Sequence, residues 1–139
     1  MHGKLIRKRP LYTETDYVRL KQRLCDDPGA LSLDEADLDI LRGGIAAYCW
    51  ESPLAGTVGE AAELAQQAAL EMTPRPGRVI RSAILYIMGD SRSGLETVER
   101  ISSVIQSAIL DGATTILGTK FFDGQKGIRF LLVTSEEYL

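Results

Sequence analysis

The stretch from Val79 to Met88 constrains the fold more than any other part of the sequence. It reads Val-Ile-Arg-Ser-Ala-Ile-Leu-Tyr-Ile-Met, and its second half is an uninterrupted apolar run. A strand buried on both faces of a sheet has such a run, whereas a strand with one solvated face alternates apolar and polar residues. The pattern therefore predicts a central strand.

A helix and two more strands are predicted after this strand. Ser93-Gly94-Leu95-Glu96 has the form of a capping box and opens a helix whose apolar stripe extends to Ile109. The segments 113–119 and 128–134 are rich in apolar and β-branched residues, and a turn containing Asp123-Gly124 joins them. This order of elements predicts an α/β layer with helices packed on a sheet.

Another helix is predicted before the central strand. Thr57-Val58-Gly59-Glu60 has the S/T-x-x-E form of a capping box, and good helix formers, many of them alanine, run from Ala61 to Met72. Small side chains allow such a helix to lie close to a sheet. Residues 57–135 are therefore predicted to form the α/β part of a two-layer α+β sandwich.

Residues 13–56 are predicted to be a helical part that precedes this sandwich. Apolar residues at three- and four-residue spacing predict a short helix over 13–25 and a second helix from near Asp34 to Trp50, although Gly43-Gly44 weakens the second one. We expect Trp50 and its neighbours to lie in the core rather than on a contact surface, and the same for Phe121-Phe122.

An acidic loop lies between these two predicted helices. After the turn at Pro28-Gly29, four carboxylates follow within six residues, namely Asp34, Glu35, Asp37 and Asp39. Part of this charge is ordinary at the start of a helix, because the free backbone N–H groups and the positive end of the helix dipole favour acids. The loop is nevertheless the candidate site for chemistry.

The composition limits the classes of function. With 139 residues, a net charge of −3 and an isoelectric point near 5.2, the chain is expected to be one globular domain over residues 13–139 that does not bind nucleic acid. The sequence has only two cysteines, Cys25 and Cys49, and no signal-like or membrane-spanning apolar stretch. We therefore expect the protein to lie in a reducing cytoplasm.

The first twelve residues form a basic arm on this acidic protein. Lys4, Arg7, Lys8 and Arg9 precede Pro10, and such arms are usually solvated tails, with docking onto an acidic partner or membrane surface as the functional alternative. The single histidine, His2, also lies in the arm, so we expect neither histidine-centred catalysis nor a histidine-based metal site.

Taken in order, these segments resemble the C-terminal half of FtsZ, the bacterial relative of tubulin. The resemblance covers roughly residues 14–135 and rests on several motifs in the family's order. They are Pro28-Gly29 followed by Ser32-Leu33-Asp34-Glu35-Ala36-Asp37, then Gly59-Glu60-Ala61-Ala62-Glu63, Ala113-Thr114-Thr115-Ile116-Leu117-Gly118-Thr119, and Arg129-Phe130-Leu131-Leu132-Val133-Thr134. The resemblance implies an FtsZ C-terminal-domain-like sheet with packed helices, preceded by two helices.

The resemblance also implies a role for the acidic loop. In that family it is the synergy loop, which reaches from one filament subunit into the nucleotide pocket of the next and positions water for GTP hydrolysis. Asp34 and Asp37 match the two family acids, whereas Ser32 replaces an asparagine and Glu35 stands where phenylalanine is common. Asp34 and Asp37 would then be catalytic only in a partner's GTP site, and Ser32, Glu35 and Asp39 would belong to the interaction loop.

Two functions from different classes remain open. The first is an interaction module that binds or modulates a GTPase filament, of the kind used in cell division, or a separate GTP-binding half. The sequence as given has no glycine-rich phosphate loop upstream of the acidic loop, so we expect no nucleotide or other cofactor in the isolated chain, with Gly43-Gly44 and Gly89-Asp90-Ser91 as weak alternatives. The second is a small α/β enzyme or ligand-binding protein that shares only the layout. A homo-oligomer is compatible with the first.

Overall fold

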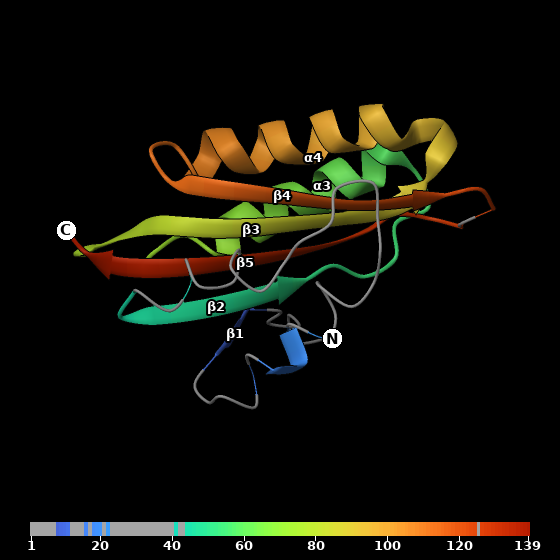
Figure 1. Ribbon diagram of the computed structural model, residues 1–139. Helices are drawn as coiled ribbons and strands as arrows, with labels where there is room; N and C mark the ends of the chain where they lie inside the picture. The colour runs from blue at the N-terminus through green and yellow to red at the C-terminus, as the bar shows by residue number, and fades with distance from the viewer. Residues whose placement is uncertain are drawn as a thin grey trace, which may run out of the picture.

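The described residues form a five-stranded sheet with helices packed against it (Figure 1). The computed structural model describes residues 8–11, 16, 18–20, 22, 41, 44–124 and 126–139. The elements are β1 (Lys8–Pro10), β2 (Ala46–Glu51), α3 (Val58–Glu71), β3 (Arg78–Asp90), the short 3₁₀ helix η1 (Ser91–Ser93), α4 (Gly94–Ile109), β4 (Thr114–Phe122) and β5 (Arg129–Tyr138).

The strands lie in the order β1-β2-β5-β3-β4. Only β3 and β4 run parallel, with α4 as the crossover between them, and the remaining neighbours are antiparallel. The prediction of a central strand over 79–88 is confirmed, because β3 has β5 on one side and β4 on the other. The turn at Asp123-Gly124 joins β4 to β5, but these two strands do not pair, since β3 lies between them.

Both long helices cover the same face of the sheet (Figure 1). The predicted cap of α3 is present, because the Thr57 side chain accepts a hydrogen bond from the Glu60 N–H at 3.1 Å. The alanines of α3 that face the sheet are buried, as their small size predicts. The main core consists of these residues: Trp50, Ala55, Ala61, Ala65, Ala68, Met72, Ile80, Ala83, Leu85, Ile87, Ile101, Ile105, Leu110, Ile128, Phe130 and Leu132.

A second apolar cluster lies on the opposite face. Side chains at alternate positions of a strand point to opposite faces, so β2, β3 and β5 contribute a second set of residues there. That set is Cys49, Ile84, Tyr86, Leu131 and Val133, and it packs with Leu20 and Leu41. The sheet is therefore buried on both faces along its centre, as the apolar run in β3 predicts.

Two predictions for the first third of the chain need correction. The predicted helix from Asp34 to Trp50 is wrong at its end, because Ala46–Glu51 is strand β2, although Leu41 is helical. The basic arm over 1–12 is not a tail throughout, since Lys8–Pro10 pairs with β2. The helical residues among 16–22 agree with the predicted first helix.

The predictions about aromatic residues hold where the structure describes them. Trp50 is fully buried and stacks on Phe130, with ring centroids 5.4 Å apart. Phe121 packs partly buried against the main core, whereas the side chain of Phe122 lies outside the described part of the structure. None of the helices in the described ranges is long and apolar enough to cross a membrane.

Candidate functional site

The acidic loop predicted from the sequence lies outside the described residues. This applies to Ser32, Asp34, Glu35, Asp37 and Asp39 alike. The structure does describe some residues on either side of it in the sequence, including Leu20 and Leu41.

Leu20 precedes the loop and Leu41 follows it, and the two side chains are 5% and 1% exposed. Both pack in the second apolar cluster, on the sheet face opposite α3 and α4. The backbone carbonyl of Leu41 also accepts a hydrogen bond from the Ser135 hydroxyl at 3.1 Å. The two described residues that bracket this part of the sequence are thus buried on one face of the sheet.

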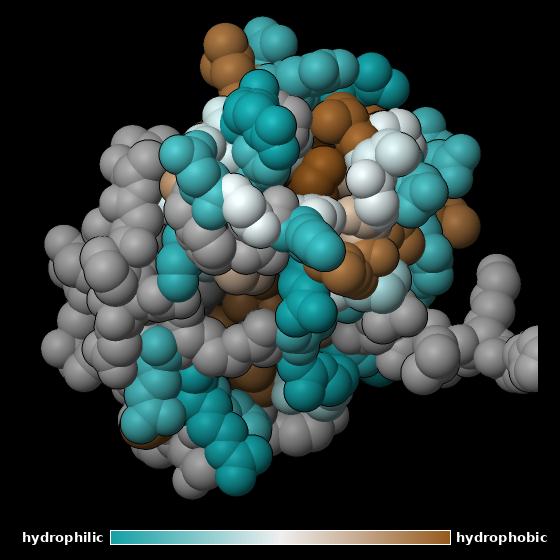
Figure 2. Space-filling model, turned by 90° about the vertical axis from the view of Figure 1, so that its right-hand side faces the viewer, coloured by the Kyte–Doolittle hydropathy of each residue, from teal (hydrophilic) through white to brown (hydrophobic). Residues whose placement is uncertain are grey.

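A depression of about 480 Å³ lies at the carboxyl end of β3. Its walls come from the start of α3, the β3–α4 junction and the residues before β5, and they comprise Gly56, Thr57, Val58, Asp90, Arg92, Lys126, Gly127 and Ile128. Figure 2 views the molecule from the end where β3 and β4 finish, and apolar side chains gather there between hydrophilic ones.

Three charged residues line this depression, Asp90, Arg92 and Lys126, and the first two form an ion pair. The Asp90 carboxylate accepts the backbone N–H of Arg92 at 2.8 Å and its guanidinium at 3.1 Å. The side-chain hydrogen bond from Arg92, followed by the backbone hydrogen bond, lowers the pKa of Asp90 below its ordinary 3.8. The carboxylate therefore caps the turn of η1.

The glycines in this region serve packing. A Cβ atom on Gly89 would lie 3.1 Å from Cε1 of Phe121, and one on Gly94 would lie 3.2 Å from Cγ of the same ring. Both glycines therefore leave room for an aromatic side chain. The weak alternative of a phosphate site at Gly89-Asp90-Ser91 thus has a simpler explanation in core packing.

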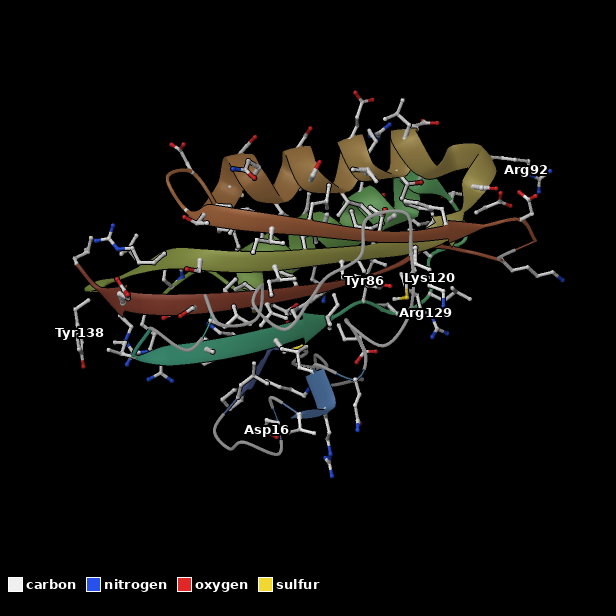
Figure 3. All side chains as sticks on the ribbon, viewed as in Figure 1. Asp16, Tyr86, Arg92, Lys120, Arg129 and Tyr138 are labelled. Carbon is white, nitrogen blue, oxygen red and sulfur yellow. The ribbon has the colours of Figure 1, made fainter. Side chains whose placement is uncertain are left out.

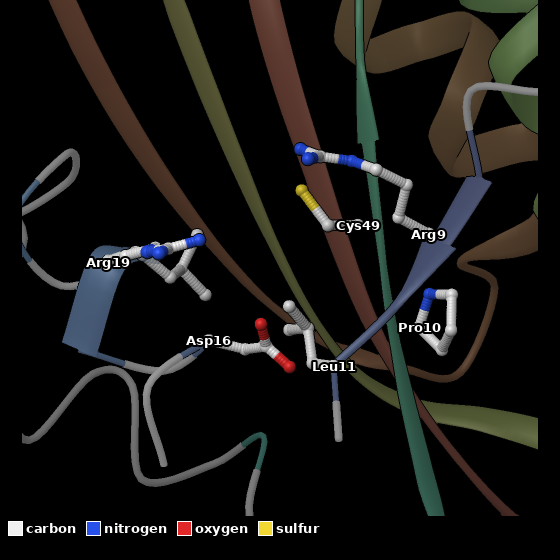
Figure 4. A pocket seen from close by; sticks show the side chains of 7 residues that line it. Arg9, Pro10, Leu11, Asp16, Arg19 and Cys49 are labelled. Carbon is white, nitrogen blue, oxygen red and sulfur yellow. The ribbon is translucent and has the colours of Figure 1, made fainter. Parts of the chain in front are cut away.

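A second cavity, of about 270 Å³, lies beside β1 on the other sheet face (Figure 4). It is lined by Arg9, Pro10, Leu11, Asp16, Arg19, Leu20 and Cys49. The Cys49 side chain is only 3% exposed, so the prediction of core packing for this residue is correct, although it stands on a strand. In the described ranges, no group of three His, Cys, Asp or Glu side chains is arranged to hold a metal ion.

A buried ionic cluster lies at the end of the sheet away from the depression. The side chain of Glu136 in β5 is 0% exposed, and its two oxygens lie 3.6 Å from Nζ of Lys8 and 3.6 Å from a guanidinium nitrogen of Arg78. Arg78 donates to the Tyr48 hydroxyl at 3.3 Å, and Nζ of Lys8 lies 4.2 Å from the centre of the Tyr48 ring. Figure 3 shows Tyr138, which lies against Arg78, at the end opposite Arg92.

The sequence prediction missed this cluster. Its four members stand on four different strands, so their proximity depends on pairings between distant segments. One local signal was present. Continuing the alternation of the predicted strand 128–134 places Glu136 on the same face as Leu132, and a carboxylate at such a position needs a partner.

Comparison with known proteins identifies the fold. No protein-family model and no curated protein matches the sequence. Among solved structures, an empty FtsZ dimer from M. jannaschii superposes with a TM-score of 0.59 and 22% identity, covering 88% of this chain and 38% of that one. An FtsZ W319Y mutant from M. jannaschii superposes with a TM-score of 0.56 and 22% identity, covering 88% of this chain and 39% of that one. CetZ1 from Haloferax volcanii, a GDP-bound monomer, gives 0.50 with 13% identity, covering 74% and 33%.

The chain shares its fold with FtsZ. It spans less than two fifths of the length of each of these FtsZ and CetZ chains. The FtsZ-like α+β layout predicted from the order of the sequence motifs is thereby confirmed.

Proposed function

We propose that this chain is an FtsZ-type interaction module that binds a GTP-binding subunit through its acidic loop. The observation that carries the proposal is the FtsZ-like fold over 88% of the chain, together with acids in the sequence at the positions of the synergy loop. In this proposal the chain holds no nucleotide of its own. The nucleotide belongs to the partner.

Asp34 and Asp37 are the residues assigned to the chemistry. Hydrolysis of a γ-phosphate needs an oriented, polarised water, and a carboxylate can accept a proton or a hydrogen bond from that water. The anchoring of Leu20 and Leu41 on one sheet face supports a loop that is presented to a partner, because both flanks are fixed by burial. Ser32, Glu35 and Asp39 would then contact the rim of the partner's pocket.

The consequence for a filament follows from symmetry. Head-to-tail growth needs two complementary surfaces on each subunit. A module that presents the loop surface occupies the nucleotide end of a filament subunit and competes with the next subunit for that end. We therefore propose that it limits filament growth and alters GTP turnover at the occupied end.

The test is to mix the purified chain with FtsZ from the same source and to follow sedimentable polymer and phosphate release. We expect the amount of sedimentable polymer to fall as the concentration of the chain approaches that of FtsZ. We also expect the rate of GTP hydrolysis per unit of polymer to change. Unchanged polymer and turnover at equal concentrations would contradict the proposal.

A matched pair of variants isolates the loop. The double variant Asp34→Ala, Asp37→Ala should lose the effect on turnover. The control, Glu63→Ala with Glu99→Ala, removes the same charge from exposed positions of α3 and α4 and should retain it. GTP hydrolysis by the isolated chain would favour the alternative of an independent enzyme.

A further inference from the structure

The outer edge of β2 pairs with an extended basic segment. In this structure the chain's own residues 8–11 form that segment. Lys8, Arg9 and Pro10 pair antiparallel with Trp50, Cys49 and Tyr48, and the Leu11 N–H donates to the Ala47 carbonyl at 2.9 Å. Main-chain pairing of this kind gives affinity, and pockets for alternate side chains give specificity.

The pocket for the Lys8 side chain is specific for a cation. Its ammonium lies 3.6 Å from the fully buried carboxylate of Glu136 and 4.2 Å from the centre of the Tyr48 ring. Neither oxygen of Glu136 accepts a hydrogen bond from the described residues, so its ion pairs with Lys8 and Arg78 are what compensate its burial. A second pair, Arg9 with Glu51 at 3.5 Å, adds to the match at the surface.

The residues that surround Lys8 belong to a different part of the chain from Lys8 itself. Glu136, Tyr48, Glu51 and Arg78 stand on β2, β3 and β5, whereas the bound segment is only residues 8–11. Exchange of an identical segment between copies requires no new contacts, because the same pairing forms within one chain or between two. As the edge strand, β1 pairs with β2 alone. Its release breaks one strand pairing, the ion pairs of Lys8 and Arg9 and the packing of Leu11, and exchange re-forms all of them in the other copy.

We propose that residues 8–11 exchange between two copies of this chain. Each copy adds its segment to β2 of the other and places Lys8 beside the other's Glu136. The product is a symmetric dimer with two such contacts. The contact is formed by residues 8–11 and the edge of β2 alone, so the proposal does not depend on the proposed GTPase partner.

Charge reversal tests the exchange in the full chain. A Lys8→Glu variant places two carboxylates together beside Arg78 within one chain, and a Glu136→Lys variant adds a third cation beside Lys8 and Arg78. Each alone should be a monomer by light scattering. An equimolar mixture should form a heterodimer, because both segments then find an opposite charge only in the other chain.

The double variant Lys8→Glu, Glu136→Lys is the matched control. It restores opposite charges within one chain and should behave as the unmodified protein does, with a dimer fraction that rises with concentration. A mixture of the single variants that remains monomeric overturns the proposal, provided that circular dichroism shows both variants folded.

A cross-link keeps the proposal testable if Glu136→Lys does not fold. Arg9 and Cys49 are direct partners across the strand pair, so Arg9→Cys in a Cys25→Ser background places two thiols close enough to form a disulfide. Oxidation of the protein at high concentration should give a dimer linked between positions 9 and 49 of different chains. Linkage found only within single chains would refute the exchange.

Discussion

At the scale of single residues, the stability of this protein depends on a few large side chains packed between the sheet and its helices. Trp50 and Phe130 stand on neighbouring strands β2 and β5, stack with an interplanar angle of 20°, and are 0% and 1% exposed. Large aromatic side chains contribute most to the free energy of burial, because each removes a large apolar area from water.

Replacing Phe130 by alanine should therefore lower the free energy of unfolding by about 3–5 kcal/mol, from lost burial and the cavity left behind. Urea denaturation followed by circular dichroism measures this change. The control is Leu70→Ala in α3, where the leucine is 72% exposed and the expected change is within about 0.5 kcal/mol. Equal effects of the two substitutions would contradict this packing.

The charge on Asp90 predicts a dependence of stability on pH. Hydrogen bonds from the side chain and then the backbone of Arg92 lower the pKa of Asp90 in the folded state below 3.8. A carboxylate whose pKa is lower in the folded state than in the unfolded state stabilises the folded state when it is charged. This contribution is complete at pH values above the unfolded-state pKa, and it is lost as the pH falls through the folded-state pKa. The unmodified protein should thus exceed Asp90→Asn in stability at neutral pH.

This difference between the two proteins should shrink below about pH 3.8, where the carboxylate of the unfolded state is already protonated and that of the folded state follows. Parallel urea titrations of both proteins from pH 7 to about pH 2 measure it. A difference that stays constant over that range would mean that the carboxylate charge of Asp90 contributes nothing to stability.

At the scale of elements, the sequence predicts those whose pattern is local. β3, β4 and β5 contain their own apolar runs, and the two long helices contain their own apolar stripes. The predicted cap is observed at α3, whereas Ser93, the predicted cap of α4, lies in the 3₁₀ helix η1. β2 was missed because the helical spacing from Leu38 through Ile45 to Tyr48 continues into it. What makes 46–51 a strand is its pairing with 131–136, about eighty residues later.

The same reason applies to β1 and to the ionic cluster. Three residues cannot show a strand period, and Lys8–Pro10 is a strand only because β2 has an open edge beside it. Lys8, Tyr48, Arg78 and Glu136 meet only once the order β1-β2-β5-β3 exists. The one local signal, the place of Glu136 in the alternation of β5, indicates that the carboxylate needs a partner but does not identify that partner.

The close contact of α3 with the sheet gives a prediction at this scale. Ala65 and Ala68 are both fully buried on the face of α3 that meets the core. Ala68→Leu should destabilise the protein by about 1–3 kcal/mol, because added carbons force neighbouring side chains out of their preferred rotamers.

Gln66→Leu is the matched control for this substitution. Gln66 lies exposed on the same helix, so the same new side chain should change the unfolding free energy by no more than about 0.5 kcal/mol. If Ala68→Leu also left the free energy of unfolding unchanged in urea denaturation, the close contact between α3 and the sheet would be contradicted.

At the scale of the whole molecule, the main core joins the helices and the strands into one unit. It contains residues from α3, α4, β2, β3 and β5, while the second cluster is formed by the opposite faces of the same central strands. The two clusters share the strands β2, β3 and β5, so separating these strands disrupts both clusters. The resemblance to FtsZ could be seen in the sequence because it rests on the order of several motifs along the whole chain, not on the correct assignment of each element.

This shared sheet predicts that the protein unfolds in a single cooperative transition. Trp50 is the only tryptophan in the chain and lies on β2 within the main core, so its fluorescence reports on the sheet, whereas far-ultraviolet circular dichroism reports mainly on the helices. Both signals should give the same urea midpoint, as expected for a two-state domain of this size.

Phe130→Ala should move both midpoints together, because the ring it removes contacts Trp50 on one strand and belongs to the core that the helices cover. Two separate midpoints would mean that α3 and α4 leave the sheet before its strands separate, which would contradict a core formed jointly by helices and strands.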